Sequence, residues 1–267
     1  MSPAQMSTAI SRGIIELKQF FRQRDAVVFT FSLPAIMLLL LGSIFSDEVS
    51  GTGVTASQMF TAGMIAAGVA STTFVNLGIG VAMDRDDGTI KRLLGTPMPR
   101  TGYLLGKLVL ILVLTLAEVA ILLAVGVVLF GLDLPTDLMR WFTFAWVFGL
   151  GVTGCSLLGI AASSLPRTAR SAPAVMNLPY LVLSFISGVF VIPLKQLPEP
   201  LIQIGSLFPL KWMAQGFRSV FLPDSLVGQE VAGSWEHGRT AIVLAAWCVG
   251  GLVLCLSTLR WRSRQAG

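Results

Sequence analysis

Residues 104–130 read LLGKLVLILVLTLAEVAILLAVGVVLF, and Lys107 and Glu118 are the charged side chains in this otherwise apolar run. A helix needs about 20 mainly apolar residues to cross the roughly 30 Å hydrocarbon core of a bilayer. Within lipid, a single segment satisfies its own backbone N–H and C=O groups only by forming a helix. The run therefore predicts a membrane-spanning helix.

Five more apolar runs of spanning length lie elsewhere in the chain, at about 26–45, 58–82, 139–164, 172–192 and 239–260. A membrane barrel would instead show alternating segments of about ten residues, which are absent. We therefore expect an all-α polytopic membrane protein, in which residues 1–267 form a single transmembrane domain of six helices.

The composition supports this class, since 54% of the 267 residues are hydrophobic and 12% are charged. Soluble domains carry about 25% charged residues. A chain this apolar needs lipid as part of its solvent, which argues against a soluble enzyme, a nucleic-acid module, a disordered chain or a coiled coil. The three cysteines and the single His237 lack metal-site spacing. We expect no catalytic, cofactor-binding or metal-binding residue here, and no nucleic-acid partner.

The basic residues predict the orientation. With six spans, both termini lie on the same side as the loops near 83–107 and 165–171, and this side holds fourteen of the nineteen Lys and Arg residues. Cytoplasmic loops carry such an excess of Lys and Arg. We therefore expect a multi-pass protein of the cell membrane with both termini in the cytoplasm.

Two segments outside the spans have an amphipathic character. In residues 8–24, Ile10, Ile14, Leu17 and Phe21 recur at helical spacing, which predicts a helix in the cytoplasmic interface. This helix either only anchors the chain or also touches a partner. Residues 198–222 contain two apolar runs too short to cross, each preceded by proline. They predict either two half-helices that dip into the membrane from outside or two helices on its surface.

The loop at 83–100 predicts one short helix. Asp86, Asp87 and Thr89 favour a helix start, while Gly95 and Pro97 favour its end. The side chains of Ile90, Leu93 and Leu94 share one face, and Lys91 and Arg92 lie beside them. Such a helix either fits a groove on another protein or rests on anionic headgroups.

The residues of this loop carry a resemblance to a known family. Asp86-Asp87-Gly88-Thr89, Arg92-Leu93-Leu94 and Thr96-Pro97 resemble the cytoplasmic loop of ABC-2 type transporter permeases. In the second half, the similarity to the drug and lipo-oligosaccharide exporters of that family rests on Asn177-Leu178-Pro179, Ser187-Gly188-Val189-Phe190, Leu197-Pro198, Phe208-Pro209-Leu210 and Arg218.

The resemblance implies that two permease chains, identical or sister chains, pair around a central path and that each docks a cytoplasmic ABC ATPase subunit. The loop helix would be the coupling helix to that ATPase, and the residues implied are Asp84, Asp86, Asp87, Gly88, Thr89, Ile90, Lys91, Arg92, Leu93, Leu94 and Pro97. ATP and Mg would bind in the partner. This chain lacks the GxxxxGK[ST] loop of a nucleotide site, and the nearest approach, at 102–108, has the wrong spacing. We therefore predict a transport subunit rather than an enzyme.

Polar side chains within the predicted spans are candidates for the translocation path. Glu118 lies about 16 Å along its helix from Lys107, where a carboxylate must face protein or water. It is either a gating or cargo group or a structural hydrogen-bonding residue. The family places spans two and five on the path, and the complete candidate set is Thr72, Thr73, Asn76, Glu118, Asn177 and Ser184. Small polar residues of this kind also tighten helix packing.

The expected function is export of a hydrophobic or amphipathic molecule, such as a drug, an antibiotic or a lipid-like compound. Sugar-chain paths favour stacking aromatic side chains, but the chain has only two tyrosines and most of its phenylalanines lie within apolar runs. A polysaccharide or lipo-oligosaccharide permease is the first alternative. A secondary transporter is the second, although such proteins usually show internal repeats with broken spans.

Overall fold

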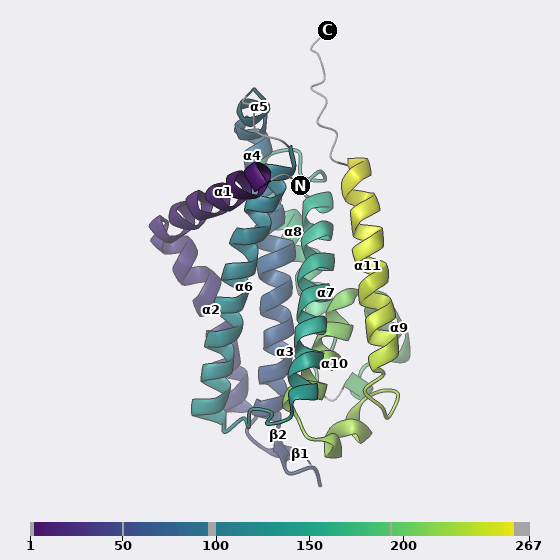
Figure 1. The fold of residues 1–267 in the computed structure, drawn as a ribbon. Coiled ribbons are helices and arrows are strands. Elements are labelled where there is room, and N and C mark those ends of the chain that lie inside the picture. The colour runs from purple at the N-terminus through teal and green to yellow at the C-terminus, as the bar shows by residue number, and fades with distance from the viewer. Residues whose placement is uncertain (1–2, 50, 96–99, 193, 259–267) are drawn as a thin grey trace.

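The computed structural model of the protein describes residues 3–49, 51–95, 100–192 and 194–258, and the side chains in these ranges except those of 3–10, 93–94 and 100–101. The chain forms a bundle of helices (Figure 1). The helices are α1 (Pro3–Arg22), α2 (Arg24–Ile44), α3 (Ala56–Ala70), α4 (Leu77–Asp86), α5 (Thr89–Leu94), α6 (Arg100–Phe130), α7 (Leu138–Ala162), α8 (Ala172–Ile186), α9 (Glu199–Ser206), α10 (Pro209–Phe221) and α11 (His237–Thr258).

A small antiparallel hairpin joins α2 to α3. Its strands are β1 (Glu48–Val49) and β2 (Val54–Thr55), with Glu48 opposite Thr55. The side chain of Thr55 accepts a hydrogen bond from the backbone N–H of Gln58, and the Gln58 side chain accepts one from Thr55 N–H, which together start α3 with a capping box. The hairpin lies at the opposite end of the bundle from α5 (Figure 1). We call these two ends the β-hairpin end and the α5 end.

Five helices in the described residues are long and apolar enough to cross a membrane: Arg24–Ile44, Ala56–Asp86, Gly102–Phe130, Leu138–Ala162 and His237–Thr258. They correspond to five of the six predicted spans, and the protein is a mainly helical multi-pass membrane chain. The second of them contains a π-helical turn, Ser71–Asn76, between α3 and α4. The apolar pattern of 58–82 predicts a single span, and the π-helical turn lies within it.

The span predicted at 172–192 is the exception. Helix α8 ends at Ile186 and has 15 residues, so it is only about 22 Å long. Gly188, two residues later, has a φ of 73°, a left-handed conformation that glycine adopts without a steric penalty and that ends a right-handed helix. The apolar composition of 187–192 concealed this stop, because side chains buried in a turn are as apolar as those in a helix.

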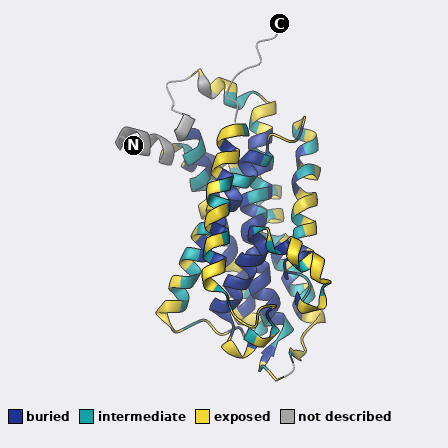
Figure 2. Cartoon of the chain, turned by 90° about the vertical axis from the view of Figure 1, so that its right-hand side faces the viewer, coloured by how far each residue is buried: buried dark blue, intermediate teal, exposed yellow. Residues whose placement is uncertain are grey.

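The segment after α8 folds back into the bundle. Helix α9 and helix α10 occupy the range predicted for two short outer helices, and each has a proline in its first turn. All thirteen residues of α10 are buried, and the helix packs against α3 and α7. The buried residues form an inner column of the bundle (Figure 2), and α2 and α11 are the least buried of the five long apolar helices.

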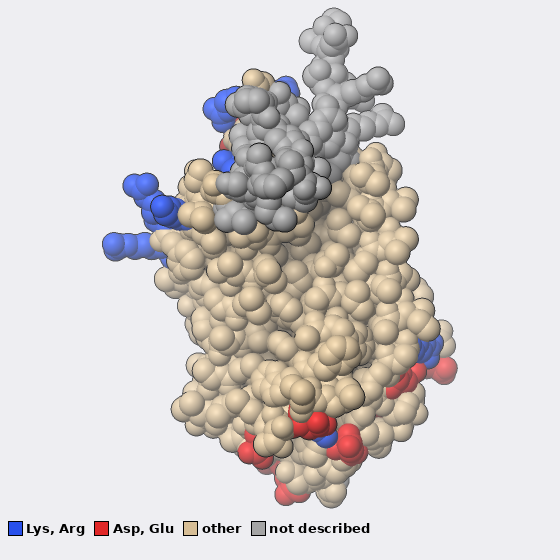
Figure 3. Space-filling model, in the orientation of Figure 1, with Lys and Arg blue, Asp and Glu red and all other residues tan. Residues whose placement is uncertain are grey.

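Charge separates the two ends of the bundle. On the face seen in Figure 3, Lys and Arg gather towards the α5 end and most Asp and Glu towards the β-hairpin end. Helix α1 lies across the long axis of the bundle at the α5 end (Figure 1). It occupies the range predicted for the interfacial helix, but Glu16 on its polar side is buried, whereas Ile14 and Phe21 are exposed. Glu16 therefore faces the bundle, whereas Lys18 and Arg22 of the same helix are exposed, so burial on α1 does not follow the predicted amphipathic pattern.

Candidate functional site

Helix α5 is built on a local cap that the sequence predicted. The carboxylate of Asp87 accepts a hydrogen bond of 2.8 Å from the backbone N–H of Thr89, the first residue of α5. The hydroxyl and the backbone N–H of Thr89 hold the pKa of Asp87 below its usual value. At the other end, the N–H of Gly95 donates to Arg92 O at 3.2 Å. The cap fixes where α5 begins after the turn at Gly88.

The outward side of α5 is polar where the structure describes it. Lys91 and Arg92 are exposed, and Ile90 is half-buried. The side chains of Leu93 and Leu94 and the whole of Pro97 lie outside the described part of the chain. The apolar docking face predicted for α5 therefore stays a prediction, while the position of the helix at the tip of the bundle is clear in Figure 1.

The acidic residues before α5 differ in position from the prediction, which grouped them with the short helix. Asp84 and Asp86 lie in the last turn of α4, and three consecutive side chains there contact three different partners. Asp84 accepts a hydrogen bond of 2.8 Å from the Tyr103 hydroxyl of α6. Arg85 Nη2 donates to Pro166 O at 2.9 Å, and Asp86 Oδ2 accepts from Ala169 N at 2.8 Å. The end of α4 is thereby attached to α6 and to the α7–α8 connection.

Lys107 of α6 lies at the centre of a cluster of charges at this end. Its Nζ is 2.7 Å from Asp84 Oδ2 of α4 and 3.2 Å from Glu16 Oε2 of α1. Glu16 also pairs with Arg12 through two contacts of 3.1 Å. We refer to Arg12, Glu16, Asp84 and Lys107 as the Lys107 cluster. Its two cations and two anions balance, and three helices contribute to it.

Glu118 contacts the π-helical turn in the middle of the bundle. The Thr72 hydroxyl donates a hydrogen bond of 2.6 Å to Glu118 Oε2, and both side chains are fully buried. Glu118 Oε1 has no hydrogen-bond partner, and none of the ion pairs between described side chains includes Glu118. Gly68 makes room for the carboxyl group, because a Cβ atom at that position would lie 2.7 Å from Oε1.

The other candidate path residues do not all meet at one place. Thr73 and Ser184 are buried and donate to Val69 O and Tyr180 O in their own helices. Asn177 lies on the exposed side of α8 and donates to Pro173 O at 2.9 Å. Asn76 is half-buried. The structure thus brings Thr72 and Glu118 together and leaves Asn177 on a separate, outward surface.

A residue that sequence reasoning missed, Tyr180 of α8, connects α8 to α3. Its hydroxyl donates to Ala67 O at 3.2 Å. The signal was present, because a tyrosine inside an apolar run requires a hydrogen-bond partner when it is buried. With Thr72 and Glu118, this contact makes the end of α3 and the π-helical turn a polar meeting point for α6 and α8.

Comparison with known proteins adds the family. A model of the ABC-2 type transporter family matches residues 5–222, which is most of the chain. The chain belongs to this family. The resemblance of the loop motif to ABC-2 permeases is therefore confirmed.

Curated relatives of this ABC-2 chain are distant. A putative transport permease, ycf38, of Pyropia yezoensis is 25% identical over 90% of this chain and 80% of its own length. The ycf38 protein of Porphyra purpurea is 26% identical over 76% of this chain and 70% of its own length. A probable multidrug ABC transporter permease of Escherichia coli, YbhR, is 24% identical over 55% of this chain, and the match spans only 39% of YbhR.

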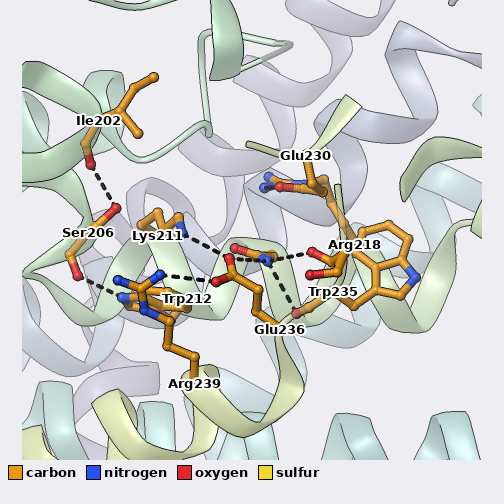
Figure 4. A network of polar contacts seen from close by, with 11 residues as sticks. Ile202, Ser206, Lys211, Trp212, Arg218, Glu230, Trp235, Glu236 and Arg239 are labelled. Atoms are coloured by element: carbon orange, nitrogen blue, oxygen red, sulfur yellow. Dashed lines mark hydrogen bonds and ion pairs between the residues drawn. The ribbon is translucent and has the colours of Figure 1, made fainter. Parts of the chain in front are cut away.

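The ABC-2 chain also contains a charged network at the β-hairpin end, which the sequence patterns did not predict (Figure 4). Arg218 of α10 pairs with Glu230 through contacts of 2.6 and 3.2 Å and donates to Gly188 O at 3.1 Å. Lys211 Nζ lies 3.9 Å from Glu236 Oε2. The seven-residue spacing of Lys211 and Arg218 within an apolar run was the signal that marked one polar side of a buried helix.

Proposed function

We propose that the protein is the permease subunit of an ATP-driven exporter that moves a hydrophobic or amphipathic molecule out across the cell membrane. Two permease chains pair around a path, and two cytoplasmic ATPase subunits bind ATP and Mg. Helix α5 docks each ATPase. The observation that carries this proposal is a capped helix at the tip of a membrane bundle, in a chain that belongs to the ABC-2 family.

The charge distribution supports a cytoplasmic location of α5. The α5 end carries exposed Lys91 and Arg92 beside the exposed cations of α1, and the β-hairpin end is mainly acidic (Figure 3). Short cytoplasmic segments carry an excess of Lys and Arg. The N-terminus lies at this end, and α11 runs back to it, so both termini would face the cytoplasm.

The sixth crossing is proposed from α8 together with the helices that follow it. Helix α8 enters from the α5 end and stops about 22 Å along the bundle. Ser225, just after α10, donates to Thr52 O of the β-hairpin connection, so the chain has reached the opposite end there. Helices α9 and α10 then form a pair that dips into the outer part of the membrane, with α10 enclosed by protein rather than lipid.

The proposal of an apolar cargo rests on the aromatic and apolar side chains that the structure describes. Both tyrosines already have internal partners, since Tyr103 donates to Asp84 and Tyr180 to Ala67 O. Neither is arranged as a platform for sugar rings. The chain instead exposes apolar side chains along α2 and α8, namely Phe29, Leu33, Leu40, Leu178, Leu181 and Phe185. These surfaces suit lipid, a second permease chain and an apolar cargo, with Asn177 of α8 beside them.

The test of this proposal is the double variant Leu93→Asp/Leu94→Asp, which places charge on the predicted apolar face of α5. The ABC ATPase that copurifies with the parent permease from its native host is coexpressed with each variant, and its copurification is measured at equal membrane abundance. We expect at least a tenfold loss of copurified ATPase. The matched control, Leu138→Asp/Met139→Asp, changes two highly exposed apolar residues near the opposite end and should retain the ATPase. Normal ATPase binding by the α5 variant would contradict docking through α5.

A further inference from the structure

The Lys107 cluster joins three helices that are far apart in the sequence. Glu16 comes from α1, Asp84 from α4 and Lys107 from α6, and the exposed fractions of their side chains are 3%, 20% and 11%. Charges with so little solvent around them are held together strongly, because separating them would leave each one poorly solvated. The cluster is therefore a joint between the three helices rather than a loose surface contact.

Close backbone packing makes α1 and α6 move together at this joint. A Cβ atom on Gly13 of α1 would lie 2.8 Å from Val109 of α6, and one on Gly106 would lie 2.7 Å from Arg12 Cγ. Glycines at such crossings allow two helices to approach closely. The Arg12–Glu16 pair and Lys107 sit directly beside this crossing. Helix α1 is thus fixed to α6 by packing and by charge.

The third member, Asp84, lies close to the docking helix. Asp84 lies in the last turn of α4, and a short connection joins α4 to Thr89 at the start of α5. Asp87 fixes the geometry of that connection. On the other side of the joint, Glu118 is about 16 Å further along α6 and contacts Thr72 in the π-helical turn. A continuous set of contacts therefore runs from α5 through Asp84 and Lys107 to the middle of the bundle.

We propose that Lys107 is a positioning residue that transmits displacement of α5 to α6 and α1. This inference rests on the proposed docking of an ATPase at α5. When the end of α4 moves with α5, the Asp84–Lys107 ion pair carries α6 with it, and α1 follows through Glu16 and the glycine crossing. Chains of packed side chains, ion pairs and rigid helices can carry coupling of this kind between distant elements.

A second connection at the same end provides an internal reference. Arg85 and Asp86 contact Pro166 O and Ala169 N in the α7–α8 connection without using Lys107. Displacement of α4 therefore reaches this connection by a separate route. Loss of Lys107 should weaken the coupling of α4 to α1 and α6, with the Tyr103–Asp84 hydrogen bond still linking α4 to α6. The α7–α8 connection should stay coupled, which a general loss of folding would not allow.

The experiment uses the permease–ATPase complex in lipid nanodiscs, with the native cysteines replaced and a bimane fluorophore on one introduced cysteine. Ile15 of α1 reports on the Lys107 route and Leu165 on the reference route, and both side chains are exposed. The change in bimane emission on trapping with ATP and vanadate is measured. In Lys107→Met we expect the change at Ile15 to fall at least fivefold, while that at Leu165 stays within twofold of the parent complex.

Two variants keep the test decisive. Lys107→Arg retains the charge and should restore the signal at Ile15, and Lys18→Met, on the exposed side of α1, should leave it unchanged. If Lys107→Met does not accumulate, Asp84→Asn removes the same ion pair from the other partner and should give the same selective loss. Equal signals in the variants and the parent, or equal loss at both reporters, would overturn the inference. Failure of the proposed function would instead show as absence of ATPase from the parent complex.

Discussion

The two ends of the bundle both contain buried ion pairs, but they connect different kinds of structure. At the α5 end, Lys107 joins α6 to α1 and α4, which are separate helices along the chain. At the β-hairpin end, Arg218 of α10 joins Glu230, only twelve residues later. The first arrangement can carry movement from one helix to another. The second holds a local segment closed over the helix that precedes it.

Exposure differs between the two ends as well. Arg218 and Glu230 have side chains that are 3% and 6% exposed, whereas Asp84 of the Lys107 cluster is 20% exposed. Each anion of the Lys107 cluster also has an additional partner, since Arg12 pairs with Glu16 and Tyr103 donates to Asp84. If Lys107 is removed at the α5 end, Glu16 and Asp84 each therefore keep one partner. At the β-hairpin end, removing Arg218 leaves a buried carboxylate without its cation.

The largest effect on stability is expected from Arg218→Leu. Breaking a buried ion pair from one side typically costs about 3–5 kcal/mol, because the remaining charge is uncompensated. Lys107→Met should cost less, about 1–3 kcal/mol, for groups that lose one of their partners. Thermal or denaturant unfolding in detergent would compare the two variants. A smaller loss in Arg218→Leu than in Lys107→Met would reverse the contrast between the two ends.

Two controls sharpen this measurement. Arg239→Leu removes an arginine that also pairs with a glutamate, but its side chain is 66% exposed. Such pairs contribute about 0–1 kcal/mol, so this variant should be nearly unchanged. Arg218→Leu combined with Glu230→Leu should recover part of the stability, because no unpaired charge remains. If the stability loss of the double variant equals the sum of the two single losses, Arg218 stabilises the protein by something other than its pair with Glu230.

A smaller effect is expected between the two ends, at Glu118. Glu118→Leu leaves the buried Thr72 hydroxyl without its acceptor, which costs roughly 1–3 kcal/mol. Glu118→Gln keeps an oxygen for Thr72, and we expect it to alter neither abundance nor transport. Transport by the two variants is compared at equal membrane abundance. Changed transport in Glu118→Gln would make this residue a cargo or gating group instead of a structural one.

The smallest perturbation uses single cysteines at the β-hairpin end, in a background without native cysteines. Ser225 is exposed, Ile204 of α9 is about half exposed and Met213 of α10 is fully buried. A membrane-impermeant maleimide should label Ser225→Cys rapidly and Met213→Cys very slowly. Ile204→Cys should also label slowly, because we place α9 against lipid. Rapid labelling of all three would mean that the segment between α8 and α11 is a solvated outer domain.

Much of the fold followed from local patterns in the sequence. Apolar runs of spanning length predicted the five long helices, and the prolines at 200 and 209 predicted where α9 and α10 begin. Asp87 and Thr89 predicted the start of α5. These features depend on residues within one or two helical turns of one another, so the order of the amino acids is sufficient to recognise them.

The candidate site could be predicted less completely from the sequence. The six-residue path set came from polarity within spans and from family resemblance, and it combined Glu118 and Thr72, which touch, with Asn177, which faces outward. Polarity shows that a side chain needs a partner but not which helix supplies it. Likewise, the early end of α8 at Gly188 lay hidden in an apolar stretch that is buried as a turn.

The sequence by itself determined a multi-pass helical chain, the charge difference between its ends and a capped helix in its first long loop. Only the tertiary structure decided that Lys107 meets Glu16 and Asp84, that α10 is enclosed by protein, and that Arg218 and Glu230 neutralise each other. The reason is physical. Helix formation and capping are short-range, whereas the pairing of buried charges depends on which helices pack together, and packing is a property of the whole chain.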